Sequence, residues 1–470
     1  MKLKVFCQWL RIALFSIALL SFCVLGFLTF LRPEISDKEG RRLTEFPTFS
    51  AEAFLSGEYT SQINLWYSDT FPGRDMLLDM NVGLKSLYGI HTQSFGGGNV
   101  DKDEIDKDGD FVWNDGVPTL PEQPSVPDTP STPEAPSETD APSATDKPSA
   151  EDDPDASAGG QVIEGYYVHK DTAFELYYFN QDYVDRYTRL VTQTALDLNG
   201  LATVYDMVIP TSCNYGMTPA QIEEIGASNE SDAIDYIYRA LNAYSSQLVE
   251  QNRLENPIVT LDIRALMGEH YHEYIYFRTD HHWTGLGAYY ASRFFLDQVG
   301  RTYPALDAYR KVEVPGFLGS LYNHTQSPSL RGAPDTVYAY ESPTVKELTV
   351  FNRHTGEYET IPMIYEADQL TGTWNKYLSF TNGDYAYYEM HNETVKDGSS
   401  VLVIRESFGN AFMPMLVDSY EYVYGIDYRF WRDDLATFVE EKGIDTVIFL
   451  NNIMATVNDY TIRTMETLVD

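Results

Sequence analysis

The sequence predicts an α/β fold in which a mainly parallel sheet carries helices on both faces. From residue 161 onward, strand-like apolar runs alternate with helical segments, a pattern typical of parallel sheets. The run at 401–404 is wholly apolar, as expected for a strand buried on both faces. In such sheets, functional residues collect at the carboxyl ends of strands, so a site is expected there.

The N-terminal region carries a predicted membrane anchor. Residues 12–31 form a run of 20 residues without a charge, long enough to cross a bilayer. Basic residues lie on both sides of this run, so charge alone does not settle its orientation. The acidic, Pro/Ser/Thr-rich remainder favours export. We therefore predict an uncleaved single-pass anchor over residues 1–32, with the bulk of the chain extracytoplasmic at the cell membrane; a cleaved signal peptide is the alternative.

Composition narrows the class of partner. The net charge of -37 excludes nucleic acid, because such a field repels phosphate backbones. The 35 tyrosines suit a carbohydrate-facing protein better. Cys7 and Cys23 belong to the anchor region, which leaves Cys213 alone outside it. The exported part is therefore expected to fold without an internal disulfide.

Residues 33–116 are predicted to form a membrane-proximal segment and the start of the folded domain. Helices are expected around 51–69 and 76–88, separated by a turn at Pro72-Gly73. The acidic stretch at 101–115 fits a β-hairpin better than a calcium loop, because a loop starting at Glu104 would end in an aspartate rather than a glutamate.

Residues 117–160 are predicted to be a disordered insert. They consist mostly of Pro, Ser, Thr, Ala, Asp and Glu, with almost no large apolar residue, and cannot bury enough surface to offset the entropy of ordering. The unfinished strand pair before them suggests that the insert interrupts one folded unit. The catalytic domain would then occupy residues 161–470.

Helices and strands of this domain follow in a regular order. Helices are expected at 178–198, 231–250, 286–299, 408–418 and 433–442. Strands are expected at 202–209, 257–262, 273–277, 401–405, 422–426 and 446–450, with extra strands within 337–362.

The first segment that carries chemistry lies between the strand at 273–277 and the helix at 286–299, for which Thr284 is a plausible N-cap. Here Asp280 precedes His282 by two residues. An aspartate at this distance can orient an imidazole and stabilise its charged form, the support that a general base needs. The segment itself has no nucleophile.

The second segment supplies one. Ser407 follows the strand at 401–405 and precedes a helix, so its backbone N–H could help to stabilise an oxyanion. A serine needs a base to attack at neutral pH, and Asp280 with His282 is the convincing Asp–His pair of the sequence. The alternative role for Ser407 is that of a helix N-cap.

These two segments carry a resemblance to a known family. The stretches are Thr279-Asp280-His281-His282-Trp283-Thr284 and Ile404-Arg405-Glu406-Ser407-Phe408. They resemble the bacterial DHHW family, which is similar to the SGNH-hydrolase-like domains of alginate O-acetyltransferases. The resemblance implies an SGNH-hydrolase-like (flavodoxin-like) fold and a triad in which Ser407 is the nucleophile, His282 the base and Asp280 its orienting acid.

The sequence also departs from the SGNH pattern. Arg405-Glu406 stands before the serine where Gly-Asp is usual, and the Gly and Asn blocks that donate to the oxyanion are not obvious. The candidates for oxyanion or substrate binding are Arg405, Asn382, Gly383 and Asn410, with Asn451 as a weaker one.

Zinc is a competing hypothesis for the same segment. Four histidines, His270, His272, His281 and His282, lie close together in sequence. Adjacent histidines on an extended segment point to opposite sides, and no H-E-x-x-H spacing occurs, so we predict no metal and no cofactor. His281 is expected to be structural. Trp283 is expected to be a core aromatic, with a sugar subsite as its alternative role.

The expected function is acyl-ester chemistry on a cell-surface polysaccharide, either as an O-acetyltransferase or as an acetylesterase. An exported enzyme cannot draw directly on cytosolic acetyl-CoA. By analogy with the alginate system, a polytopic membrane O-acyltransferase is therefore the expected partner that donates acetyl. The alternative is a non-catalytic protein that keeps the fold and binds glycans or assists an assembly.

Overall fold

The computed structural model describes residues 160–163, 165–352, 355–370 and 372–469, together with scattered residues between 35 and 72. The predicted anchor, the helix at 76–88, the hairpin at 101–115 and the insert up to residue 159 lie outside the described residues. Within the described part, no helix combines the length and apolar character needed to cross a membrane.

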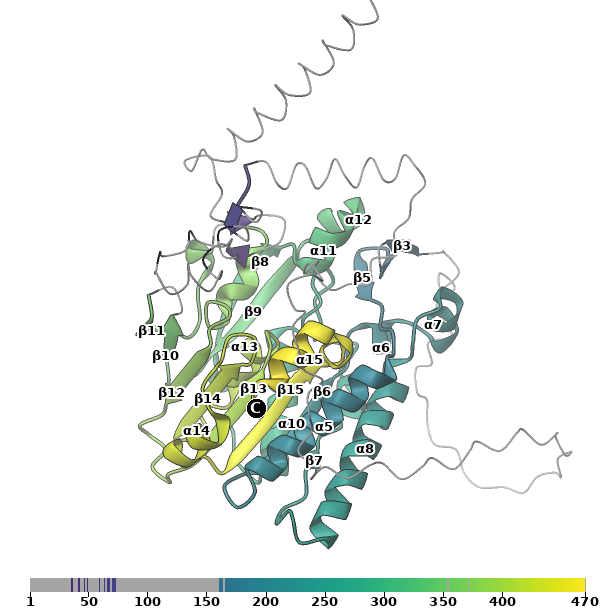
Figure 1. Cartoon of the computed structure of the whole chain (residues 1–470). Helices are drawn as coiled ribbons and strands as arrows, with labels where there is room; N and C mark the ends of the chain where they lie inside the picture. The colour runs from purple at the N-terminus through teal and green to yellow at the C-terminus, as the bar shows by residue number, and fades with distance from the viewer. Residues whose placement is uncertain are drawn as a thin grey trace, which may run out of the picture.

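One eight-stranded sheet organises the domain, in the order β11-β10-β12-β14-β13-β15-β6-β7 (Figure 1). Its strands are β6 (Thr203–Ile209), β7 (Val259–Thr260), β10 (Glu347–Asn352), β11 (Glu357–Pro362), β12 (Tyr387–His391), β13 (Ser400–Arg405), β14 (Tyr422–Asp427) and β15 (Thr446–Asn452). The five strands from β14 to β7 run parallel to one another, whereas β12, β10 and β11 extend the sheet antiparallel. The predicted α/β class with a mainly parallel sheet is confirmed.

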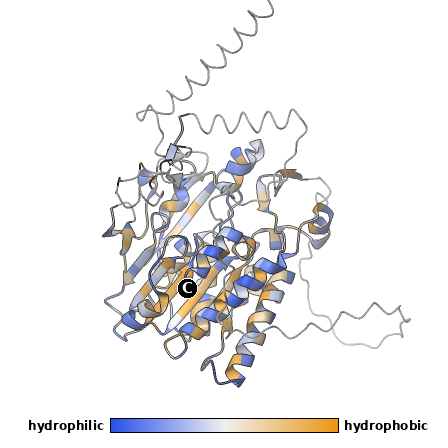
Figure 2. Ribbon diagram, in the orientation of Figure 1, coloured by the Kyte–Doolittle hydropathy of each residue, from blue (hydrophilic) through white to orange (hydrophobic). Residues whose placement is uncertain are grey.

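Both faces of the central strands are buried, as predicted. Along β13, Val401 and Val403 belong to one hydrophobic core, and Leu402 and Ile404 belong to the other. This alternation follows from the two-residue period of a strand. The orange central strands in Figure 2 show the same apolar character.

Helices cover each face. One core is closed by α5 (Gln181–Asp197), α8 (Glu230–Glu250), α14 (Leu435–Lys442) and α15 (Asp459–Glu466). The other is closed by α9 (Arg264–Glu269), α10 (Gly285–Gln298), α13 (Gly409–Phe412) and the antiparallel pair β8 (Arg310–Phe317) and β9 (Asp335–Glu341). In Figure 1, α5, α8, α14 and α15 lie in front of the sheet, and α10, β8 and β9 lie behind it.

Shorter elements complete the described part. They are β1 (Ile35–Ser36), β2 (Arg41–Arg42), β3 (Gln161–Ile163), β4 (Tyr166–His169), β5 (Thr172–Glu175), α6 (Cys213–Gly216), α7 (Pro219–Ile225), α11 (Ser320–Thr325) and α12 (Pro328–Arg331), with the 3-10 turns η3 (Leu306–Ala308), η4 (Ala367–Gln369), η5 (Asn375–Ser379), η6 (Met413–Met415) and η7 (Ile453–Val457).

Two predicted elements are corrected. The helix expected at 408–418 is only α13 followed by η6, because Pro414 has no N–H for a continuing helical ladder. The strand expected at 273–277 is an irregular loop. Within it, the N–H of Glu273 donates to His270 O and that of Ile275 to Glu273 O, and the segment forms an isolated bridge, Tyr276 to Trp283, rather than a strand.

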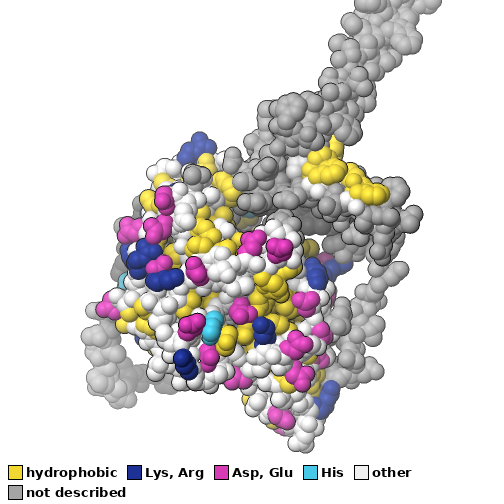
Figure 3. All heavy atoms as spheres, turned by 90° about the vertical axis from the view of Figure 1, so that its left-hand side faces the viewer, with side chains coloured by type: hydrophobic (Ala, Val, Ile, Leu, Met, Phe, Trp, Pro, Cys, Tyr) yellow, Lys and Arg dark blue, Asp and Glu magenta, His cyan; other side chains and the backbone are white. Residues whose placement is uncertain are grey.

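The surface agrees with the acidic composition. On the face seen in Figure 3, acidic side chains outnumber basic ones and are interspersed with hydrophobic patches.

A buried aspartate in the central sheet makes the stability of the fold depend on pH. Asp206 on β6 is fully buried; its Oδ1 accepts from the Tyr187 hydroxyl at 2.5 Å, and its Oδ2 has no partner in the described part of the chain. Burial raises the pKa of Asp206 to about 7, against the opposing hydrogen bond from Tyr187. The folded state therefore holds the proton more tightly than the unfolded state, and stability falls as pH rises from about 4 to about 7.

We predict that Asp206→Asn removes this pH dependence. The variant should gain stability relative to wild type as pH rises from about 4 to about 7, by the order of a few kcal/mol at the upper end. Thermal melts across this range measure the difference. Asp307→Asn, the same change at an exposed position of η3, is the control and should show no such trend. A constant difference between the Asp206 variant and wild type would contradict the prediction.

Candidate active site

The Asp280–His282 segment is a tight loop that ends at α10. Tyr276 and Trp283 form an isolated antiparallel bridge, and the Phe277 N–H donates to the His282 carbonyl oxygen at 3.2 Å. The side chain of Thr284 accepts from the N–H of Gly287, so the predicted N-cap is confirmed. The loop thereby holds Asp280 and His282 at the start of a helix.

The structure brings three of the predicted residues into contact. Asp280 Oδ1 lies 2.6 Å from His282 Nδ1, and His282 Nε2 lies 2.7 Å from Ser407 Oγ. Ser407 occupies the turn between β13 and α13, so it lies at the carboxyl end of a central parallel strand. These contacts form the hydrogen-bonded chain that a Ser-His-Asp relay needs.

The Asp280 carboxylate is buried and well supplied with donors. Its Oδ1 accepts from the N–H of His282 at 3.0 Å, and its Oδ2 accepts from the N–H of Ser320 at 2.8 Å. Burial opposes ionisation, but the neighbouring charges of His282 and His281 and these hydrogen bonds outweigh it and hold the pKa of Asp280 well below its usual range. The ionised acid fixes a proton on His282 Nδ1, which leaves Nε2 free to accept from Ser407.

Aromatic side chains position His282 and the turn that carries Ser407. The His282 ring stacks on Tyr377 with centroids 3.9 Å apart, and the Tyr377 hydroxyl donates to the Ser407 carbonyl oxygen at 3.1 Å. Trp283 is fully buried, and its Nε1 donates to the Phe408 carbonyl oxygen at 3.1 Å. Trp283 is therefore a core aromatic, as predicted, and its alternative role in a sugar subsite is wrong.

His281 is half-buried beside the triad. Its Nδ1 lies 2.5 Å from Ser320 Oγ, and its ring lies 3.9 Å from that of His282. The expectation that the two histidines point to opposite sides is therefore wrong, because the loop is not extended. Burial and the charge of His282 lower the pKa of His281.

The metal hypothesis can be tested against this geometry. In the part of the chain that the structure describes, Asp280, His281 and His282 are the group whose ligand atoms come within 4.8 Å of one another. However, Nδ1 of His282 is engaged by Asp280, its Nε2 by Ser407, and Nδ1 of His281 by Ser320. A cation here would have to displace the contacts of the triad, so the residues do not fit a resident metal.

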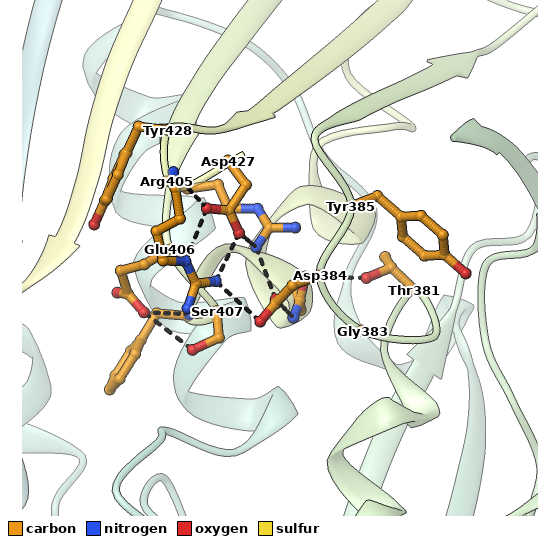
Figure 4. A network of polar contacts seen from close by, with 12 residues as sticks. Thr381, Gly383, Asp384, Tyr385, Arg405, Glu406, Ser407, Asp427 and Tyr428 are labelled. Carbon is orange, nitrogen blue, oxygen red and sulfur yellow. Dashed lines mark hydrogen bonds and ion pairs between the residues drawn. The ribbon is translucent and has the colours of Figure 1, made fainter. Parts of the chain in front are cut away.

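The four candidates for oxyanion or substrate binding are held by structural contacts, and two of them, Arg405 and Gly383, are labelled in Figure 4. Arg405 is fully buried, and its Nη1 lies 3.0 Å from Asp384 and 3.1 Å from Asp427. Asn410 is also buried; it donates to Asp384 at 2.9 Å and accepts from Thr381 at 3.1 Å. These contacts leave neither side chain an open face toward a substrate.

Asn382 and Gly383 lie in the loop that carries Asp384. Both have a positive φ, and Asn382 Nδ2 donates to the Tyr385 hydroxyl while the Gly383 carbonyl accepts from Tyr388. The structure gives them a role in shaping this loop. In contrast, no described residue accepts from the N–H of Ser407, so this proposed oxyanion donor has no competing partner.

Sequence reasoning missed two acids beside the triad. Burial raises the pKa of Glu175, at the end of β5, against the charge of His281, with Asp280 and Glu406 raising it further. Glu406 is buried, and its Oε2 lies 3.1 Å from Ser407 Oγ, where it competes with His282 Nε2 for the single hydroxyl hydrogen. Its position directly before Ser407 was the signal available in the sequence; Glu175 offered none.

The backbone of Gly319 packs directly against Asp280. A Cβ atom at this position would lie 2.2 Å from Asp280 Oδ2, too close for any real contact. We predict that Gly319→Ala displaces Asp280 and slows the reaction of Ser407 with a serine-directed reagent about 10²-fold. Labelling kinetics measure this effect.

Gly332→Ala is the matched control. Both glycines have a negative φ that alanine tolerates, but a Cβ at Gly332 would meet its nearest atom at an ordinary 3.5 Å. If the two variants slowed the reaction equally, the space that Gly319 leaves beside Asp280 would not matter for the reactivity of Ser407.

A model of the DHHW family, described as DHHW protein, matches residues 39–117 and 146–426. No curated protein sequence matches the chain.

Solved structures with a similar fold include a DHHW family protein from Eubacterium siraeum DSM 15702, at 24% identity and a TM-score of 0.55, over 65% of this chain and 96% of that one. Bacillus cereus PatB1 with sulfonyl adduct aligns at 14% identity and a TM-score of 0.50, over 63% and 97%. The O-acetyltransferase domain of Pseudomonas putida AlgJ aligns at 11% identity over 64% and 99%, with a TM-score of 0.36 that is too low to place the fold.

Proposed function

The chain belongs to the DHHW family, and on this premise we propose that it is a serine-dependent acyl-ester enzyme with an SGNH-hydrolase-like fold. The observation that carries the proposal is the contact chain from Asp280 through His282 to Ser407, at 2.6 and 2.7 Å. All three residues lie in motifs of the sequence that resemble the family.

The geometry supports a two-step acyl transfer. Ser407 Oγ attacks the carbonyl carbon of an acetyl ester while His282 Nε2 takes its proton, and Asp280 stabilises the resulting imidazolium. The N–H of Ser407 donates to the oxyanion. His282 then gives its proton to the leaving alcohol. A sugar hydroxyl or water, deprotonated in turn by His282, attacks the acetyl-serine. The acetyl group leaves as the sugar ester or as acetate, and His282 returns the proton to Ser407 Oγ.

We infer that the acceptor is a cell-surface polysaccharide and that the chain is anchored in the cell membrane by residues 12–31. A polytopic membrane O-acyltransferase would supply acetyl from the cytosol. The resemblance to alginate O-acetyltransferases and the uncharged N-terminal run support these expectations.

Covalent capture of the nucleophile tests the proposal without knowledge of the acceptor. Sulfonyl fluorides react with activated serine hydroxyls, and the aligned PatB1 structure holds a sulfonyl adduct. The purified full-length chain should gain one sulfonyl group, located at Ser407 by peptide mass spectrometry. Ser407→Ala should gain none, whereas Ser329→Ala, at an exposed position of α12, should react like wild type.

A second candidate function has an observation in its favour. Glu406 stands beside Ser407 where the SGNH pattern has an aspartate in Gly-Asp-Ser, and Arg405 fills the glycine position. A protein with this change could keep the fold and bind glycans without catalysis. Absence of labelling at Ser407, together with glycan binding by the same preparation, would establish that alternative.

A further inference from the structure

Glu406 makes an unusual set of contacts at the nucleophile. Its side chain is buried, yet three polar groups lie 3.1 Å from its oxygens: Oε2 accepts from the Phe408 N–H and faces Ser407 Oγ, and Oε1 accepts from the Asn452 N–H. The Ser407 hydroxyl has one hydrogen, so it donates either to Glu406 or to His282, and the two N–H groups are the constant donors to Glu406. Figure 4 shows the carboxylate beside Ser407. Among the described residues, no Lys, Arg or His lies within ion-pair distance of it.

The three groups around Glu406 lie at the ends of two neighbouring strands. Ser407 and Phe408 form the turn that follows β13, and Asn452 ends β15, which pairs parallel with β13. The side chain of Asn452 also caps η7. The Glu406 carboxylate is thus the polar bridge between the nucleophile turn and the end of the adjacent strand.

We propose that Glu406 is a positioning residue that holds Ser407 Oγ against His282 Nε2. The inference rests on the proposed function. One carboxylate oxygen accepts from the N–H of Phe408, the residue after Ser407, and the other accepts from Asn452 and ties this turn to β15. Ser407 Oγ therefore has a defined position even before substrate binds.

The number of donors makes a carboxylate necessary. An ionised carboxylate accepts at both oxygens, whereas an amide has one accepting oxygen and one NH₂ group. In Glu406→Gln, the NH₂ group must face either the Phe408 N–H or the Asn452 N–H. Either arrangement sets two donors against each other, which breaks the bridge and shifts the turn.

Inactivation kinetics with a sulfonyl fluoride test the proposal on the full-length chain. The maximal inactivation rate constant (kinact) reports the alignment of Ser407 with His282, and the apparent binding constant (KI) reports reagent binding. Glu406→Gln should lower kinact about 10²-fold, with KI changed less than about threefold. Glu406→Asp keeps the carboxylate but shortens its reach, and should restore part of the lost kinact.

Glu230→Gln is the matched control. Glu230 is also a buried carboxylate that accepts from two donors, the Thr211 N–H at 2.8 Å and the Thr211 hydroxyl at 2.6 Å, but it has no contact with Ser407. Its variant should lose stability without the loss of kinact.

The outcomes separate the two proposals. Labelling of wild type at Ser407 together with an unchanged kinact in Glu406→Gln would overturn the positioning role alone. An equal loss of kinact in Glu230→Gln, or a loss confined to KI, would also overturn it. No labelling of wild type at Ser407 would overturn the proposed function itself.

Discussion

The His282→Ala variant is expected to hydrolyse a chromogenic acetyl ester about 10³-fold more slowly than wild type. His282 Nε2 is the acceptor that lies 2.7 Å from Ser407 Oγ, and its Nδ1 is held by Asp280. Without this base, the serine hydroxyl keeps its proton at neutral pH and remains a weak nucleophile. Release of the coloured alcohol by the full-length chain measures the rate.

His281→Ala is the matched control for this prediction. It removes a histidine whose ring lies 3.9 Å from that of His282 but whose Nδ1 contacts Ser320 rather than the nucleophile. We expect a loss below about tenfold, because His281 Nδ1 lies 3.9 Å from Asp280 Oδ1, against 2.6 Å for His282 Nδ1, and its partner is Ser320 rather than Ser407. If His282→Ala and His281→Ala lost the same activity, the assignment of His282 as the base and His281 as a neighbour would be wrong.

The sequence was sufficient for the parts of this fold that local patterns encode. Val401 to Ile404 alternate between two cores, which explains why an unbroken apolar run predicts a strand buried on both faces. The direction of β10, β11 and β12 was not predictable. It depends on which edge of the parallel sheet they join, and hydrophobic period carries no such information.

The residues of the candidate site also differ in whether the sequence alone could predict them. Asp280 and His282 were predictable because they lie two residues apart, and Ser407 because it follows a buried strand. Gly319 and Tyr377 were not, because they act through packing between segments that are distant in the sequence. Arg405 was misjudged for a related reason: an arginine at a strand end resembles a binding residue until its buried partners are known.

Arg405→Ala is expected to be the most destabilising single change at the site. Arg405 is fully buried, and its guanidinium lies 4.4 Å above the Tyr388 ring as well as against Asp384 and Asp427. Burial opposes ionisation of Asp384, but the charges of Arg429 and Arg405 hold its pKa well below the usual range. Removal of Arg405 leaves the fully buried Asp427 and the partly exposed Asp384 to share Arg429, so the free energy of unfolding should fall by about 3–5 kcal/mol.

Arg310→Ala provides the comparison because Arg310 also bridges two acids. Its Nε lies 2.8 Å from Glu341 and its Nη1 lies 2.9 Å from Glu366, but its side chain is about half exposed, at 51%. Solvent screens such contacts, so the variant should lose no more than about 1 kcal/mol. Denaturant unfolding of both variants measures the difference. Similar losses would mean that burial does not determine how much Arg405 contributes to stability. They would also mean that Asp384 and Asp427 ionise independently of Arg405.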